Sequence, residues 1–154
     1  MCLIIDANCA VSVFASPTPA EFKPIHRWIN NKRGLLVLGG RNKQELFRIK
    51  DAREAICEWN RRSKASFIDD VEIERKETVL RSSSPPISSN DEHILALAIV
   101  SGARWLCCTG DGSLCKDFKN KNIISNPKGR IYKYATHGSK LNHSPSCYFS
   151  KNYC

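Results

Sequence analysis

The chain lacks any apolar run long enough to cross a bilayer. Its longest runs, such as ILALAIV at 94–100, are far shorter than the about 20 residues that a transmembrane helix needs. The first ten residues, MCLIIDANCA, have no basic start and carry an acid within their apolar stretch, unlike a signal peptide. We therefore expect a soluble, cytoplasmic protein that makes no contact with a membrane.

Tight cysteine motifs are also missing, although the 154 residues include eight cysteines. No pair has the C-x₂-C spacing of a structural zinc site, and the candidates near the C-terminus are widely spread: His137, His143, Cys147 and Cys154. Cys107 and Cys108 are adjacent in an apolar run, so they point to opposite faces of a strand. Other cysteines lie in apolar or helical surroundings, where a free thiol behaves as a small hydrophobe. We expect reduced, mostly buried thiols.

Acidic residues are absent from positions 118–154, which carry seven of the chain's Lys and Arg residues. The net charge of +9 is concentrated there, because the rest of the chain is almost balanced. Tyrosine and phenylalanine are interleaved with these cations, which suits a polyanion whose bases can stack on aromatic rings. The alternative is a solvated tail that only keeps the protein soluble. The residues that we expect to contact nucleic acid are Lys119, Lys121, Lys128, Arg130 and Lys133.

The length and the apolar pattern predict one domain with a single core. Short apolar runs predict buried strands at 2–6, 34–40 and 105–109, an edge strand at 65–68 and a further strand at 123–124. Helical spacing predicts helices near 9–14, 21–31, 42–49, 51–64, 71–80, 90–101 and 113–118. Buried strands that alternate with helices indicate an α/β three-layer sandwich around a mainly parallel sheet.

The predicted helix over 90–101 has signals at both ends. Ser89 and Glu92 have the spacing of a capping box, and Gly102 fits the C-terminal stop. Asp91 therefore falls in the first turn of this helix.

Four acids follow or flank the predicted strands. Asp6 ends the first strand, Asp111 follows the strand at 105–109, and Glu45 lies in the helix after the second strand. Because ligands of open parallel sheets gather beyond the carboxyl ends of the strands, we expect these acids and Asp91 to converge. Singly, an acid can complement a helix dipole, form a turn or lie on an exposed helix. A carboxylate that completes a buried strand, however, needs a partner.

Four neighbouring carboxylates repel one another. At about 4 Å and an effective dielectric constant near 20, a like-charged pair costs roughly 4 kcal/mol. A hard divalent cation removes this repulsion, and Mg²⁺ prefers carboxylate and water oxygens. A phosphate-binding loop is missing, because GGRNK has neither the spacing nor the Ser or Thr of a P-loop. The acids therefore predict a Mg²⁺ site.

The segments that carry these acids resemble the PIN-domain family. LIIDAN resembles its opening strand, VLGGRNKQELFRI its glutamate-bearing segment, SNDEHILALAIVSGA its most recognisable motif and LCCTGDGSLCKDF its closing motif. The order and spacing of the four segments carry the resemblance, which covers roughly residues 1–126. We therefore expect a PIN-like nuclease domain at 1–126 and a basic C-terminal extension at 127–154.

The resemblance implies a metal-dependent nuclease, most often acting on RNA and often the toxin of a toxin–antitoxin pair. One or two Mg²⁺ or Mn²⁺ ions would activate water and stabilise the leaving 3′ oxygen. Asn8 and Thr109 would orient the carboxylates. An antitoxin protein and a second copy of the chain are the implied protein partners. The implied metal ligands are Asp6, Glu45, Asp91 and Asp111, with Asp117 as an outer ligand.

Three alternatives remain open from the sequence. The same fold could bind RNA without cutting it. A haloacid-dehalogenase-type phosphatase could use Asp6 as nucleophile, but its general acid would stand at position 8, where this chain has Asn8. The extension itself could bind substrate, wrap around a partner or cap the sheet.

Overall fold

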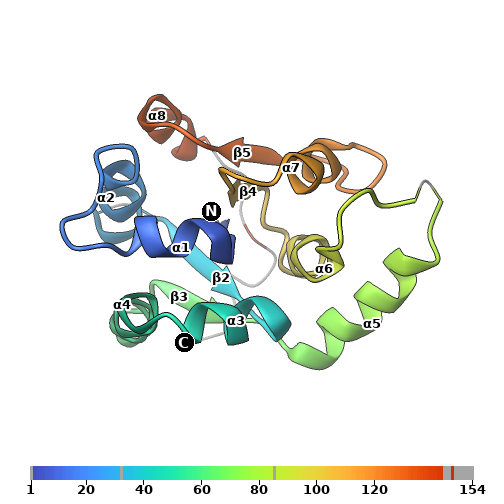
Figure 1. Cartoon of the computed structure of the whole chain (residues 1–154), viewed down its shortest axis with the longest axis horizontal. Coiled ribbons are helices and arrows are strands. Elements are labelled where there is room, and N and C mark those ends of the chain that lie inside the picture. Colours follow the sequence, from blue (N-terminus) through green and yellow to red (C-terminus); the bar gives the residue numbers. More distant parts are fainter. Residues whose placement is uncertain (1, 32, 85, 144–146, 148–154) are drawn as a thin grey trace.

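The computed structural model describes residues 2–31, 33–84, 86–143 and 147. They form three layers, with a central sheet covered by helices on both faces (Figure 1). The sheet has the strand order β3-β2-β1-β4-β5, and each neighbouring pair is parallel. The α/β architecture and parallel sheet predicted from the sequence are therefore confirmed. The strands are β1 (Cys2–Ile5), β2 (Leu35–Leu38), β3 (Ala65–Phe67), β4 (Trp105–Cys107) and β5 (Arg130–Tyr132).

The helices lie close to the predicted ranges. None of those in the described ranges is long and apolar enough to span a membrane. A short 3₁₀ helix, η1 (Ala135–His137), precedes the last helix. The α-helices are α1 (Ala7–Val13), α2 (Lys23–Asn31), α3 (Gly40–Phe47), α4 (Lys50–Arg61), α5 (Asp70–Arg81), α6 (Glu92–Ser101), α7 (Gly112–Lys119) and α8 (Gly138–Leu141).

Helices on both faces explain why the strands are apolar at every position. In β1, Leu3 and Ile5 point into the core shared with α1, α2 and α4. Cys2 and Ile4 point into the opposite core, shared with α5, α6 and α7. A strand buried on both faces has no polar side, so it appears as a continuous apolar run. β1 lies in the middle of the sheet, between β2 and β4, in keeping with this burial on both faces.

The start of α6 differs from the prediction. Asp91 is the N-cap, and Gly102 ends the helix with a φ of 74°, as expected for a left-handed stop. The predicted Ser89–Glu92 capping box is wrong. The amide of Ser89 instead donates to the carboxylate of Asp117, 2.8 Å away. This long-range bond holds Ser89 before the N-cap, so its hydroxyl does not cap the helix.

The predicted strand at 123–124 is also wrong. The amides of Ile123 and Ile124 both donate to the carbonyl of Asn120, which forms a turn after α7. Ile124 is buried without joining the sheet. The fifth strand is β5, which pairs with β4 and comes from the basic extension. Within the described residues, the extension therefore adds an edge to the sheet.

One pair of cysteines contradicts the expectation of reduced thiols. Cys2 and Cys147 form a disulfide, with their Cα atoms 5.9 Å apart. The fold brings them together across 145 positions of sequence, which no local pattern indicates. The cysteines that remain free are Cys9, Cys57, Cys107, Cys108 and Cys115. Cys154, named above as a tail thiol, lies outside the described residues.

Candidate functional site

Three of the predicted acids are N-caps of helices that meet at the same sheet edge. Asp6 joins β1 to α1, Asp91 begins α6, and Asp111 begins α7 after β4. Asp is a residue type preferred at this position, and Asp111 alone of the three caps its helix with its side chain, which accepts from the amide of Leu114. The charge of Asp91 acts on Asp6, Asp111 and Glu45. Asp91 therefore interacts electrostatically with each of the other three acids.

Asp6 is the most deeply buried of these acids, with only 4% of its surface exposed. Burial raises its pKa, and the neighbouring charge of Asp91 raises it further. Hydrogen bonds from the Asn8 side chain, the Cys108 thiol and the Ala7 amide act in the opposite direction. The amide of Asp6 donates to the carbonyl of Cys107 at 3.0 Å, which fixes the acid beside the end of β4.

Asp91 and Asp111 have pKa shifts of opposite sign. Burial raises the pKa of Asp91, and the charges of Asp111 and Glu45 add to this while His93 opposes it. The pKa of Asp111 is lowered, chiefly because Ser113 donates its hydroxyl at 2.6 Å and Leu114 its amide at 2.8 Å. Asp111 thus retains its charge, whereas Asp91 is the acid that its neighbours disfavour as an anion.

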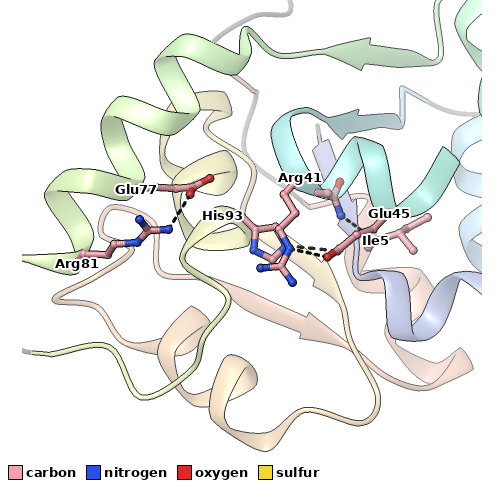
Figure 2. A network of polar contacts seen from close by, with 7 residues as sticks. Ile5, Arg41, Glu45, Glu77, Arg81 and His93 are labelled. Carbon is pink, nitrogen blue, oxygen red and sulfur yellow. Dashed lines mark hydrogen bonds and ion pairs between the residues drawn. The ribbon is translucent and has the colours of Figure 1, made fainter. Parts of the chain in front are cut away.

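Glu45 projects from α3 towards α6, as Figure 2 shows. Its Oε1 accepts a hydrogen bond from Nε of Arg41 at 2.7 Å, and its Oε2 lies 3.5 Å from Nε2 of His93 (Figure 2). The buried amide of Asn42 anchors α3 by donating to the carbonyl of Ile5 at 3.0 Å. Asn42 thereby holds the helix that carries Glu45 against the end of β1, directly before Asp6.

The sequence did not single out His93. This residue is 4% exposed, and among the described residues its Nε2 has no hydrogen-bond partner despite the nearby carboxylate of Glu45. It is a polar ring that begins the stretch HILALAIV, whose other residues are apolar. A histidine at the start of so apolar a stretch is the signal that could have drawn attention to it.

Asp117 is buried, and its contacts are with the loop before α6. Its carboxylate accepts three hydrogen bonds, from the amide and hydroxyl of Ser88 and from the amide of Ser89. These donors belong to the loop that leads into Asp91. The observed contacts of Asp117 therefore hold this loop in place.

The two residues expected to orient carboxylates have different partners. Asn8 hydrogen-bonds to Asp6, as noted above. Thr109 contacts Cys9 instead, with its hydroxyl oxygen 3.2 Å and its amide 3.1 Å from the thiol sulfur. Hydrogen bonds from Cys107 and Thr109, set against burial, lower the pKa of Cys9 to about 7. Thr109 therefore joins the end of β4 to α1 through a thiol.

The acid cluster is chemically suited to a hard dication. In their present positions, no three His, Cys, Asp or Glu side chains of the described chain are grouped to hold one ion. Mg²⁺, however, is often bound by one or two carboxylates, with water and substrate phosphate completing its shell. Burial and, to a lesser extent, the neighbouring carboxylates raise the pKa values of Asp6 and Asp91, and a dication beside Asp91 would offset the repulsion between these acids. The residues therefore fit such an ion bound largely through water.

Most of the predicted nucleic-acid contacts lie away from this cluster. They gather at and after the end of α7 and around the start of β5, whereas Lys133 follows the end of β5. All are exposed except Lys133, which is half-buried. The residues concerned are Lys119, Lys121, Lys128, Arg130 and Lys133.

Comparisons with known proteins give little further information. No model of a known protein family matches the chain, and no curated protein matches it. Among solved structures, the chain is similar to one described as VapBC2 from Rickettsia felis bound to a DNA fragment from their promoter. The identity is 16% and the TM-score 0.45, with 87% of this chain and 99% of the other covered. A likeness of this degree assigns no function to the chain.

Proposed function

We propose that this protein is a metal-dependent endoribonuclease of the PIN type. The observation that carries the proposal is the cluster of Asp6, Glu45, Asp91 and Asp111 around the carboxyl ends of β1 and β4. The PIN-like motifs and the basic extension support RNA as the substrate. An antitoxin protein and a second copy of the chain are proposed as partners on the resemblance of the motifs alone.

Asp6, Asp91 and Asp111 would hold Mg²⁺ or Mn²⁺, with Glu45 completing the set. When bound, the ion supplies Lewis-acid polarisation of the phosphate and lowers the pKa of a coordinated water. Asp111 is held for this role by Ser113 and Leu114, which keep its carboxylate charged and oriented. Asn8 orients the carboxylate of Asp6 in the same way.

Arg41 is placed to bind the scissile phosphate. Its side chain is 63% exposed, and Glu45 fixes its guanidinium at 2.7 Å. The charge of Asp91 also acts on it, so Arg41 lies beside the acid cluster. An arginine in this position can pair with a non-bridging phosphate oxygen and counter the repulsion between the phosphate and the acids.

The test is cleavage of mixed cellular RNA and of single-stranded DNA in Mg²⁺, in Mn²⁺ and in EDTA. We expect metal-dependent products from RNA with the unaltered protein and none with Asp6→Asn. The matched control is Asp51→Asn, which removes one exposed acid from α4 and should leave cleavage unchanged. Equal cleavage by the unaltered protein and Asp6→Asn would contradict the assignment of the site.

A second candidate function is an RNA-binding module that does not cut. It is favoured by the absence of a ready-made ligand triad in the described chain and by the engagement of Glu45 with Arg41 and His93. RNA binding without products in either metal would support this alternative. Metal-dependent products that disappear in Asp6→Asn would exclude it.

A further inference from the structure

A separate basic cavity lies where β4 and β5 begin. Its volume is about 370 Å³, within the range of small-ligand pockets. It is lined by four cationic side chains, a histidine and a tryptophan, and no acid contributes to its lining. These side chains come from α7, β4, β5 and the extension: Lys119, Trp105, Lys128, Arg130, His137 and Lys140.

The cavity and the acid cluster are at opposite ends of the same strands. Trp105 is the first residue of β4 and Arg130 the first of β5, whereas Asp111 follows the end of β4. Because these strands are parallel, the cavity lies at the starting edge of the sheet. From Trp105 to Thr109 the extended chain covers roughly 13 Å, at about 3.3 Å per residue. The cavity is therefore too distant to form part of the acid cluster.

The cations of this cavity are available to a ligand. Within the described residues, no ion pair involves any of its Lys or Arg side chains. Lys119, Lys128 and Lys140 are exposed. Arg130 is held in place by Trp105, with its guanidinium carbon 5.8 Å from the indole ring centroid. Like charges gathered around a cavity repel one another, and binding an anion would relieve this repulsion.

Trp105 gives an independent sign of a missing acceptor. The indole is 2% exposed, yet in the described chain its Nε1–H has no hydrogen-bond partner. Buried indole N–H groups usually have one. Trp59 has such a partner, because its Nε1 donates to Asn30 at 3.1 Å, whereas the Nε1 of Trp28, outside this cavity, lacks one as Trp105 does. Because Trp105 lines the cavity, an oxygen of a bound ligand is the acceptor that we propose for it.

We propose that this cavity binds a backbone phosphate of single-stranded RNA. The identity of the strand rests on the proposed function, whereas the phosphate site follows from the cavity itself. Unpaired cations beside an aromatic ring are the combination that holds single-stranded nucleic acid. A strand that fills the cavity and also reaches the acid cluster must extend over several nucleotides. The cavity thereby positions the strand before it is cut.

The first test measures binding of a fluorescent 2′-O-methyl RNA, which resists cleavage, by anisotropy in EDTA. Lys119→Gln/Lys128→Gln/Arg130→Gln should bind at least ten times more weakly than the unaltered protein. The dependence of log K on log salt should also become less steep by about 2, since each single-strand phosphate contact contributes about 0.7. Lys119→Gln/Lys128→Gln retains the contact between Arg130 and Trp105 and should show a smaller loss of the same kind.

The matched control removes the same number of positive charges from the opposite side of the sheet, where β3 is the edge strand. Arg48→Gln/Lys50→Gln/Arg53→Gln replaces three exposed cations around the start of α4. We expect binding within a factor of two of the unaltered protein. Equal losses in the two triple variants would show that only net charge matters and would overturn the proposal. Melting temperatures of all variants confirm that each is folded.

The second test follows the indole N–H signals of ¹⁵N-labelled protein by NMR. The RNA should shift the Trp105 signal, assigned with Trp105→Phe, and leave that of Trp59 in place. Inorganic phosphate and a mononucleotide are the small-anion probes. If either binds as tightly as the RNA, the cavity is a small-anion site and the strand proposal fails. No change at Trp105 with any probe would exclude the cavity altogether.

The two proposals fail in different ways. Binding is measured in EDTA with an uncleavable strand, so it does not depend on the acid cluster. If Asp6→Asn leaves cleavage unchanged while the cavity variants lose binding, the nuclease site is wrong and the cavity stands. If cleavage disappears in Asp6→Asn while the cavity variants bind normally, the nuclease site stands and the cavity proposal is wrong.

Discussion

At the scale of single residues, the acid cluster combines carboxylates with opposite responses to pH. Asp6 and Asp91 have raised pKa values because of burial and neighbouring charge, and Asp111 has a lowered pKa because of hydrogen bonds. A raised carboxyl pKa means that the folded state binds the proton more tightly than the unfolded chain. The tighter proton binding stabilises the fold at pH values below the unfolded-state pKa of about 3.9. This contribution is lost as the pH rises through the folded-state pKa.

In the absence of metal, Asp91→Asn should therefore raise the melting temperature at pH 7. Each kcal/mol gained corresponds to about 2–4 °C in a chain of this size. Asp111→Asn should lower the melting temperature at pH 7. A carboxylate with a lowered pKa stabilises the fold at pH values above its unfolded-state pKa, and this contribution is lost as the pH falls through the folded-state pKa. Melting curves of both variants in EDTA from pH 4 to pH 8 test whether each melting temperature changes in the expected direction. A destabilised Asp91→Asn at pH 7 would contradict this account of the cluster.

His93→Phe should weaken metal binding without unfolding α6. The ring fills similar space, but Glu45 loses the imidazole that lies 3.5 Å from its Oε2. Loss of a group that orients a metal ligand typically costs about 10–100-fold in metal affinity or activity. Calorimetric titration with Mn²⁺ measures the affinity directly, and Arg41→Gln is the companion variant on the other side of Glu45. An unchanged affinity in His93→Phe would show that the imidazole does not position Glu45.

At the scale of secondary-structure elements, the loop before α6 depends on one buried carboxylate. Hydrogen bonds to a charged group contribute roughly 1.5–3 kcal/mol each and are not additive, so we expect Asp117→Asn to cost about 2–4 kcal/mol of unfolding free energy. Urea denaturation in EDTA measures this loss, with Asp51→Asn as the exposed control. If Asp117 were instead a metal ligand, the variant would equal the unaltered protein in EDTA and differ only when Mg²⁺ is added.

The elements that could be predicted from the sequence are those whose burial leaves a local pattern. β1 and β2 appear as apolar runs because helices cover both faces of the sheet. The positions of Asp6 and Asp111 follow directly from the strand ends. β5 was missed because three residues with a cation and a tyrosine form no apolar run. The capping box failed because Asp117, far along the chain, binds Ser89.

Side-chain partners across the fold could not be predicted in the same way. Glu45 was placed near the other acids, but its contact with His93 depends on how α3 packs against α6. Thr109 was expected beside a carboxylate and contacts Cys9. Such contacts arise only when distant elements pack together, so their residue types carry no periodic or local signal.

At the scale of the whole molecule, the disulfide joins β1 to the C-terminal region. Reduction should lower the unfolding free energy by about 2–4 kcal/mol, the usual effect of removing such a cross-link. Urea denaturation with and without reductant measures this, and mass spectrometry of non-reduced peptides should find Cys2 linked to Cys147. Cys57→Ser, at a free and half-buried cysteine, is the control. A cytoplasmic location stays a prediction, and absence of the linked peptide would show that the thiols are reduced as first expected.

The order of the strands also bears on when the acid cluster can form during synthesis of the chain. β1 is synthesised before β4, yet the two strands pair, with Leu3 opposite Trp105. The amide of Asp6 is fixed by the carbonyl of Cys107, and Asp111 follows a few residues later. Pairings between distant segments must wait for the later segment to be made. The nascent chain therefore cannot assemble the acid cluster until the segment that carries β4 and Asp111 has been translated. A ribonuclease built in this way would be unable to cut any RNA, its own message included, before that point.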